Sequence, residues 1–223
     1  MLTTYYLLGG VALLGSLAVQ GWLRSTYGTW SKRPNTAGIT GAEVATAILE
    51  ANGLSNDVRV EMVKGDLTDH YDPTKKVVRL SEANYRQPSV AGMAVAAHEV
   101  GHALQHATAY APLRWRSAVL PVAQIGSQWG PMLAVFGVML GATGLLQVGI
   151  WLFAGAVVFQ LITLPVEFDA SKRAHAQLAN LGLVTEQDAG GARAVLNAAA
   201  MTYVAAAATA IMYLVYFIMA SRR

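Results

Sequence analysis

The residues whose types and spacing could do chemistry are His98, Glu99 and His102, which form the pattern H-E-x-x-H. On a helix, histidines four residues apart project from one face, about 6 Å apart along the axis. That spacing lets two imidazoles bind one Zn²⁺ at about 2.1 Å each. Glu99 lies one residue round the helix, where its carboxylate can take a proton from a water that the metal activates. The pattern therefore predicts a catalytic zinc centre.

The residues around the pattern favour this interpretation over a helix that carries two ordinary histidines. Residues 94–97 and 103–104 are apolar, so the two histidines and Glu99 are expected to be buried polar groups. Buried polar groups need partners, and metal coordination, with the metal-bound water, provides them.

A catalytic zinc site needs a third protein ligand and one open position. His106 lies one turn farther along the helix and would have to reach about 6 Å too far, so we expect it at the surface. His70, in a loop between two predicted strands, could approach from outside. Glu167 is the favoured ligand, and Asp169 is its rival. On a helix Asp169 points about 200° away from Glu167 and pairs with Arg173 at i+4.

The composition indicates which elements must position these residues. Hydrophobic residues make up 54% of the 223 and charged residues only 13%, against about 25% charged in ordinary soluble domains. This excludes disordered and coiled-coil classes and predicts an integral membrane protein. There is no Cys, so disulfides and Cys-ligated metals are excluded.

Four stretches are apolar enough to cross a bilayer, which takes about 20 residues. They are residues 5–23, 118–146, 149–165 and 203–220. A cleaved signal peptide is disfavoured for the first stretch because no Lys or Arg precedes it. The second and third are separated by a short polar break at Gln147 and are expected to form a tight hairpin.

The distribution of charge predicts the orientation of these spans. Residues 24–117 carry 11 Lys or Arg and residues 166–202 carry three, while Arg222 and Arg223 follow the last span. The positive-inside rule places the two large segments in the cytoplasm. Two crossings separate His102 from Glu167, so both return to the same membrane face. This count supports Glu167 as the third ligand.

The segment 24–117 carries signals of soluble secondary structure. Thr40 and Glu43 form a capping box that predicts a helix over 41–52. Alternating residues predict a strand at 58–62 and a second at 76–80, paired as a hairpin, and a helix follows over 89–107. The strand at 77–80 could bind an extended peptide by β-addition. The predicted fold is mainly α: a polytopic membrane helix bundle with a small cytoplasmic α+β zincin-like element, in one domain over 1–223.

Several segments, one of which contains the metal pattern, carry a resemblance to a known family. They are Thr-Asp-His-Tyr-Asp-Pro at 68–73, Val-Val-Arg-Leu-Ser at 77–81, residues 97–106, Tyr-Ala-Pro-Leu-Arg at 110–114, Leu-Pro-Val-Glu-Phe-Asp-Ala-Ser at 164–171 and residues 201–207. With them the chain resembles the YugP-like family of bacterial membrane zinc metallopeptidases. It is also similar to the HtpX-like and CAAX-processing membrane proteases.

In those relatives a membrane hairpin separates H-E-x-x-H from a Glu-Phe-x-Ala-Asp-type motif whose Glu is the third ligand. The resemblance therefore implies the same role for Glu167. Ser171 stands where the relatives have Asp. A Ser hydroxyl can still hydrogen-bond a ligand histidine, but more weakly than a carboxylate does.

The sequence thus predicts an integral membrane zinc endopeptidase that cleaves protein or peptide substrates near the cytoplasmic face. His98, His102 and Glu167 are expected to hold Zn²⁺, and Glu99 is expected to be the general base. The alternative is a non-catalytic metal-bound membrane scaffold or adaptor. A transporter is disfavoured because the four spans contain no charged residue.

Other expectations concern partners. A protease needs a hydrogen-bond donor for the oxyanion, and the candidates are His70, Arg173, His175 and Tyr203. The sequence has no basic patch with interleaved aromatic residues, so we expect no nucleic-acid partner. The expected partners are the lipid bilayer and a protein substrate, and an oligomer or a regulatory membrane partner is compatible with the sequence.

Overall fold

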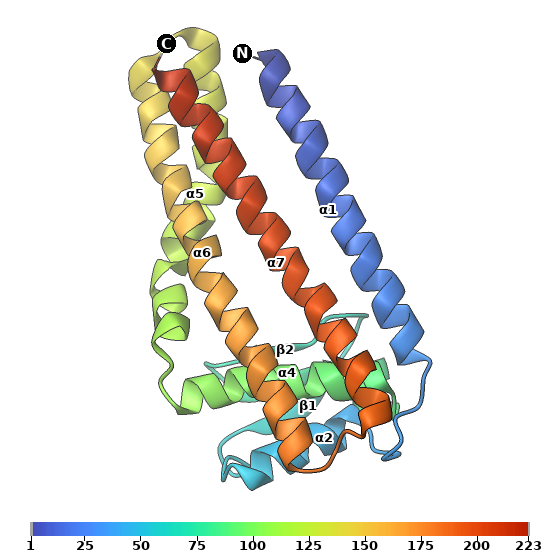
Figure 1. The fold of residues 1–223 in the computed structure, drawn as a ribbon. Coiled ribbons are helices and arrows are strands. Elements are labelled where there is room, and N and C mark those ends of the chain that lie inside the picture. The colour runs from blue at the N-terminus through green and yellow to red at the C-terminus, as the bar shows by residue number, and fades with distance from the viewer. Residues whose placement is uncertain (1, 223) are drawn as a thin grey trace. The chain divides into compact units, whose positions relative to one another are not determined.

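The computed structural model describes residues 2–222, and most of them are helical (Figure 1), as predicted. Arg223, expected to follow the last span, lies outside the described residues. The elements in chain order are α1 (Leu2–Ser31), α2 (Gly41–Ala51), β1 (Arg59–Val63), β2 (His70–Asp72), β3 (Val77–Ser81), α3 (Glu82–Arg86), α4 (Val90–Ala107), α5 (Ala111–Leu140), α6 (Thr143–Asn180) and α7 (Glu186–Ser221).

The chain divides into two compact units. The first, here called the apolar unit, contains the residues up to Gln20, Ala111–Pro165 and the residues from Met201. The second, here called the α+β unit, contains Gly21–Tyr110 and Val166–Ala200. Helices α1, α6 and α7 contribute residues to both units. The α+β unit nearly coincides with the two charged segments, residues 24–117 and 166–202, that the sequence sets apart.

Three helices in the described part of the chain are long and apolar enough to cross a membrane. They cover Thr3–Ser31, Thr143–Asn180 and Glu186–Ser221. The stretch 118–146, expected to be a further span, falls mostly in α5, which is not among these three. Helix α5 contains Pro121 and Pro131 and several polar residues that lower its hydropathy. Its passage through the membrane therefore stays a prediction.

The turn between α5 and α6 lies at Gly141 and Ala142, so the break predicted at Gln147 is wrong. Gly141 adopts a φ of +65°, and the amide of Ala142 donates to the carbonyl of Gly137 at 2.9 Å. Glycine in the left-handed region ends a helix readily, whereas glutamine is a good helix former. Gln147 accordingly lies within α6.

Glycines allow α5 and α6 to pack closely in the apolar unit, where Figure 1 shows them side by side. A Cβ at Gly126 would overlap the carbonyl of Leu152, and one at Gly149 would lie 2.7 Å from the carbonyl oxygen of Gly130. Small residues at such contacts let helix backbones approach, which is typical of membrane helices.

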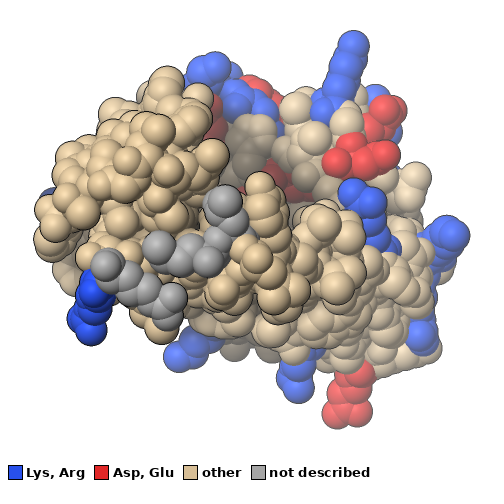
Figure 2. Space-filling view, turned by 90° about the horizontal axis from the view of Figure 1, so that it is seen from above, with Lys and Arg blue, Asp and Glu red and all other residues tan. Residues whose placement is uncertain are grey.

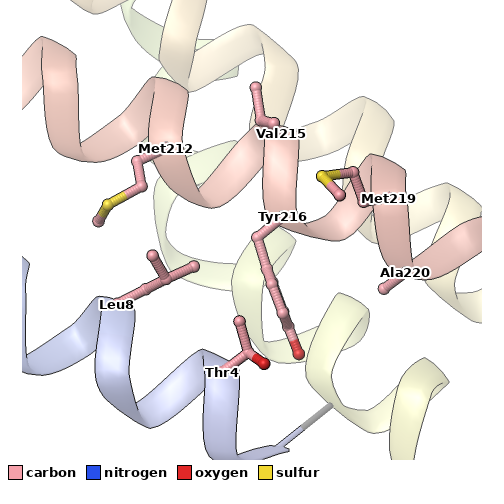
Figure 3. Close-up of a pocket in the computed structure, with 7 residues that line it drawn as sticks. All are labelled: Thr4, Leu8, Met212, Val215, Tyr216, Met219 and Ala220. Atoms are coloured by element: carbon pink, nitrogen blue, oxygen red, sulfur yellow. The ribbon is translucent and has the colours of Figure 1, made fainter.

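The surface of the apolar unit is largely hydrophobic. Trp151 is 78% exposed, Leu140 72% and Tyr6 70%. The face drawn in Figure 2 includes a wide area with neither acidic nor basic side chains. An apolar cavity of about 390 Å³ lies between α1 and α7 within this unit and is lined by the residues that Figure 3 labels. So much exposed apolar surface fits a lipid environment better than water.

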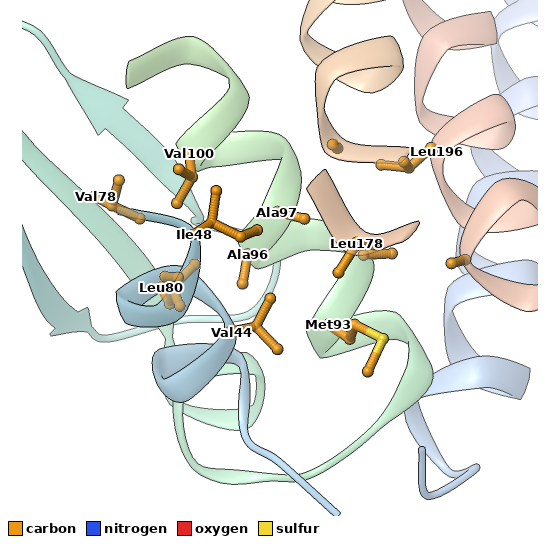
Figure 4. Close-up of a cluster of buried hydrophobic side chains, with 14 of the residues drawn as sticks. Val44, Ile48, Val78, Leu80, Met93, Ala96, Ala97, Val100, Leu178 and Leu196 are labelled. Carbon is orange, nitrogen blue, oxygen red and sulfur yellow. The ribbon is translucent and has the colours of Figure 1, made fainter. Parts of the chain in front are cut away.

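The α+β unit has a hydrophobic core of the kind found in soluble domains. Helix α2 begins at the predicted capping box, in which the amide of Glu43 donates to Thr40 Oγ1 at 3.2 Å and the amide of Thr40 donates to Glu43 Oε2 at 2.7 Å. Its apolar face packs on the sheet and on α4 (Figure 4). The labelled core residues are Val44, Ile48, Val78, Leu80, Met93, Ala96, Ala97, Val100, Leu178 and Leu196.

The sheet has the order β1-β3-β2, which differs from the predicted hairpin. Strand β1 pairs with β3 in parallel, Val60 opposite Val78, whereas β2 pairs with β3 antiparallel. The short strand β2 lies in the loop predicted between the two strands, and it forms the hairpin with β3. Alternation of side chains predicts a strand but not its partner. The predicted pairing of 58–62 with 76–80 as a hairpin is therefore wrong.

The strand order also decides whether β3 can bind a peptide. β3 is the central strand, so both of its edges are already paired. Peptide addition requires an unpaired strand edge. The prediction that residues 77–80 accept an extended peptide is therefore wrong, and the free edges belong to β1 and β2.

Candidate metal centre

Helix α4 carries the H-E-x-x-H pattern and is anchored in the core of the α+β unit. Its N-cap is Ser89, whose hydroxyl accepts a hydrogen bond from the amide of Gly92 at 3.0 Å. Alanines dominate the helix, and alanine has the highest helix propensity. Ala96, Ala97 and Val100 are buried. The histidines therefore project from a well-supported helix.

Helix α6 approaches α4 at the glycine inside the pattern. A Cβ on Gly101 would lie 2.6 Å from the carbonyl oxygen of Ala170, which is closer than van der Waals contact allows. Glycine is thus required at this position for the two backbones to meet. The contact brings Glu167 and Ser171, on either side of Ala170, to the histidines of α4.

The structure brings the three predicted ligands together. One ligand atom from each of His98, His102 and Glu167 lies within 4.8 Å of the other two. Glu167 Oε2 is 3.3 Å from His98 Nε2 and 3.6 Å from His102 Nε2. Both imidazoles therefore turn the same nitrogen toward the carboxylate, which is only 2% exposed.

These residues fit a zinc ion by the chemistry of their donors. Two imidazole nitrogens and one carboxylate oxygen make up a common protein ligand set of catalytic zinc sites, which leaves one position open. The group could therefore hold a metal ion.

The remaining nitrogen of each imidazole has a partner within the protein. His98 Nδ1 lies 3.2 Å from the hydroxyl of Ser171. The sequence allowed such a hydrogen bond between Ser171 and a ligand histidine. His102 Nδ1 lies 3.0 Å from Oε1 of Gln105. Outer partners of this kind orient metal-ligating histidines.

Gln105 is the functional candidate that sequence reasoning missed. Its side chain is completely buried, and its amide nitrogen donates to the carbonyl of Val166 at 2.7 Å and to Asp169 at 2.9 Å. A signal existed: a polar amide three residues after His102, on the same helix face and beside apolar residues, needs buried partners.

Burial and the neighbouring charges set the protonation of this centre. Burial raises the pKa of the Glu99 carboxyl, and the imidazoles of His98 and His102 oppose that rise. Burial works against a charged His102, but the hydrogen bond and charge of Glu167 outweigh it and raise the pKa of His102. A carboxyl whose pKa moves toward neutrality suits proton exchange.

The rival ligands lie outside the cluster. Asp169 Oδ2 accepts a hydrogen bond from Arg173 Nε at 2.6 Å, which confirms the predicted i,i+4 pair. His106 is exposed, as expected, and its Nδ1 lies 2.8 Å from the hydroxyl of Tyr71. His70 is exposed and its Nδ1–H donates to the carbonyl of Thr68 at 2.8 Å.

The positions of the four candidate oxyanion donors do not show which of them would contact the oxyanion. Arg173 is engaged by Asp169, and His70 by Thr68. His175 lies in the α+β unit and Tyr203 in the apolar unit. The identity of this donor stays a prediction.

The donor set, carried by an H-E-x-x-H helix, is typical of zinc metallopeptidases. Residues 5–222 match the family described as "Putative neutral zinc metallopeptidase", and the chain belongs to this family. The chain is also 48% identical, over 210 residues, to the "Putative membrane protease YugP" of Bacillus subtilis (strain 168), a match that covers 94% of this chain and 93% of that protein. These findings confirm the resemblance seen in the sequence. No solved structure matches the chain significantly.

Proposed function

We propose that the chain is an integral membrane zinc endopeptidase that hydrolyses peptide bonds of protein substrates near the cytoplasmic membrane face. The observation that carries the proposal is the convergence of His98, His102 and Glu167, with ligand atoms within 4.8 Å of one another. Glu99, on the same helix, is 8% exposed and adds a carboxylate with a raised pKa.

Each residue has a distinct role in this mechanism. His98 and His102 would hold Zn²⁺ through Nε2, and Glu167 through a carboxylate oxygen. Bound zinc would lower the pKa of a water and polarise the scissile carbonyl. Glu99 accepts the proton of the attacking water and returns it to the leaving amine. Ser171 and Gln105 hold the outer nitrogens of the two imidazoles.

The membrane location is supported by three apolar helices and by a relative named as a membrane protease. In the proposed topology α5 is a fourth span, and the α+β unit faces the cytoplasm because 14 of the 16 Lys and Arg lie in residues 24–117 and 166–202. The lipid bilayer and a protein substrate are the proposed partners.

The test uses the full chain in detergent or lipid nanodiscs. We expect about one zinc per chain by elemental analysis, cleavage of an unstructured protein such as casein, and loss of cleavage on chelation that added zinc reverses. His98→Ala should lose zinc and cleavage, and the matched control His106→Ala should keep both, because His106 is exposed and outside the cluster.

Two results would contradict the proposal. Cleavage that survives both chelation and His98→Ala would exclude the zinc mechanism. A wild-type chain that binds zinc at this site but leaves every protein substrate intact would favour the non-catalytic scaffold or adaptor instead.

A further inference from the structure

A chain of polar contacts leads from His102 away from the ligand cluster. It runs from His102 Nδ1 to the amide of Gln105, then to the carboxylate of Asp169 and the guanidinium of Arg173. All four residues belong to the α+β unit. The middle pair, Gln105 and Asp169, is here called the amide–carboxylate relay.

The surroundings of Gln105 fix which way its amide points. One end lies 2.7 Å from the carbonyl oxygen of Val166 and 2.9 Å from Asp169 Oδ2. The carbonyl of Val166 can only accept hydrogen bonds. The carboxylate of Asp169, beside the Arg173 guanidinium, also accepts and does not donate. This end of the Gln105 side chain must therefore be the NH₂ group. The other end, 3.0 Å from His102 Nδ1, is therefore the carbonyl oxygen.

This orientation determines where the proton of His102 lies. The carbonyl oxygen of Gln105 can only accept, so Nδ1 of His102 must carry the hydrogen. A neutral imidazole protonated at Nδ1 has its lone pair at Nε2. That is the nitrogen turned toward Glu167, at 3.6 Å, where a metal would bind.

The relay is held in place, because both polar atoms of the Gln105 amide and Oδ2 of Asp169 have hydrogen-bond partners. Gln105 is completely buried. Arg173 donates to Asp169 at 2.6 Å, and its guanidinium carbon lies 5.7 Å from the centre of the Tyr110 ring. Two anchored acceptors thus keep the amide from turning over.

The arrangement at His98 differs in kind. Its Nδ1 lies 3.2 Å from the hydroxyl of Ser171, and a hydroxyl can either donate or accept. Ser171 therefore orients the ring without dictating its tautomer. Only His102 has an outer partner that accepts and cannot donate.

We infer that Gln105, held in place by Asp169, is a positioning residue that fixes His102 in its Nδ1-protonated tautomer and presents Nε2 to the metal. The inference rests on the proposed zinc site. It adds two residues to that site's machinery, neither of which is one of the three proposed ligands.

The first test measures zinc affinity of Gln105→Leu by competition with a chelator, together with the absorption spectrum of the Co²⁺-loaded chain. Loss of an outer partner typically weakens metal binding about 10–100-fold. We expect that loss, with an altered Co²⁺ spectrum, in protein that remains folded. The matched control is Gln177→Leu, because Gln177 also lies on a helix of this unit but pairs with Asn52 at 3.0 Å. It should bind both metals as wild type does.

A second pair of variants keeps the size of the side chain and decides the case if Gln105→Leu does not fold. Gln105→Glu places a carboxylate against Asp169, so like charges repel and zinc binding weakens. Adding Asp169→Asn removes the charge repulsion and supplies an amide that donates to the new carboxylate, which can still accept from Nδ1–H, while the carbonyl of Val166 continues to face that carboxylate. We expect Q105E/D169N to recover part of the zinc affinity that Q105E loses.

The outcomes separate this inference from the proposed function. Zinc affinity and a Co²⁺ spectrum equal to wild type in Q105L and Q105E would overturn the positioning role while leaving the zinc site intact. So would a folded Q105E/D169N chain that shows no recovery. A wild-type chain that binds no zinc would instead overturn the proposed function.

Discussion

Glycine brings helix backbones into contact in both units, but what lies at the contact differs. In the apolar unit, a Cβ at Gly149 would lie 2.7 Å from a carbonyl oxygen of α5, and the surrounding side chains are apolar. In the α+β unit, a Cβ at Gly101 would lie 2.6 Å from the carbonyl oxygen of Ala170. There the contact is flanked by Glu167, Ser171 and Gln105. One contact serves packing, and the other also assembles a site.

The largest effect should come from removing the carboxylate of Glu167, which the contact between Gly101 and Ala170 brings to the histidines. Glu167→Ala leaves two imidazoles and no third protein ligand, so zinc affinity should fall by more than the roughly 100-fold that marks the upper range for outer partners. Competition with a chelator measures it. Glu50→Ala, at an exposed position on α2, is the control and should bind zinc normally. Equal affinity in both variants would remove Glu167 from the site.

The next effect should come from Gly101→Ala, which tests whether this contact assembles the site. The added methyl meets the carbonyl of Ala170, and overpacking of this kind costs about 1–3 kcal/mol. We expect a lower free energy of unfolding and also weaker zinc binding by the folded protein, because α6 and Glu167 must move away. Gly190→Ala, where nothing lies within 4 Å of the added carbon, should change neither.

The smallest effect on chemistry should come from Gly149→Ala. The added methyl meets the backbone of Gly130 and Ala134, so the unfolding free energy should fall by a similar 1–3 kcal/mol. Zinc affinity of the folded fraction should not change, since the three proposed zinc ligands all lie in the α+β unit. Gly144→Ala, in open space on the same helix, serves as control. Weaker zinc binding in G149A would erase the distinction between the two contacts.

The sequence was sufficient for the parts of the site that depend on local spacing. The i,i+4 rule placed His98 and His102 on one face and paired Asp169 with Arg173, and the capping box set the start of α2. Glu167 was predicted from topology, because the two crossings expected between His102 and Glu167 would return the chain to the same side.

Rules of local spacing do not predict contacts between segments that are distant in the sequence. The pairing of β1 with β3 depends on which strand the loop at 65–73 contributes, and alternation does not encode that choice. Gln105 gained its role only when α6 supplied Val166 and Asp169 as acceptors. The end of α5 was misplaced because Gly141, inside the stretch 118–146 expected to span the membrane, acts as a helix stop.

The measurement that tests the central claim most directly compares metal content with cleavage in Glu99→Gln. Glu99 is the proposed base and not a ligand, so the variant should retain about one zinc per chain. Cleavage of casein should fall by about 10²–10⁴-fold, the contribution expected of general acid–base catalysis. Zinc retained with cleavage at the wild-type rate would contradict the account.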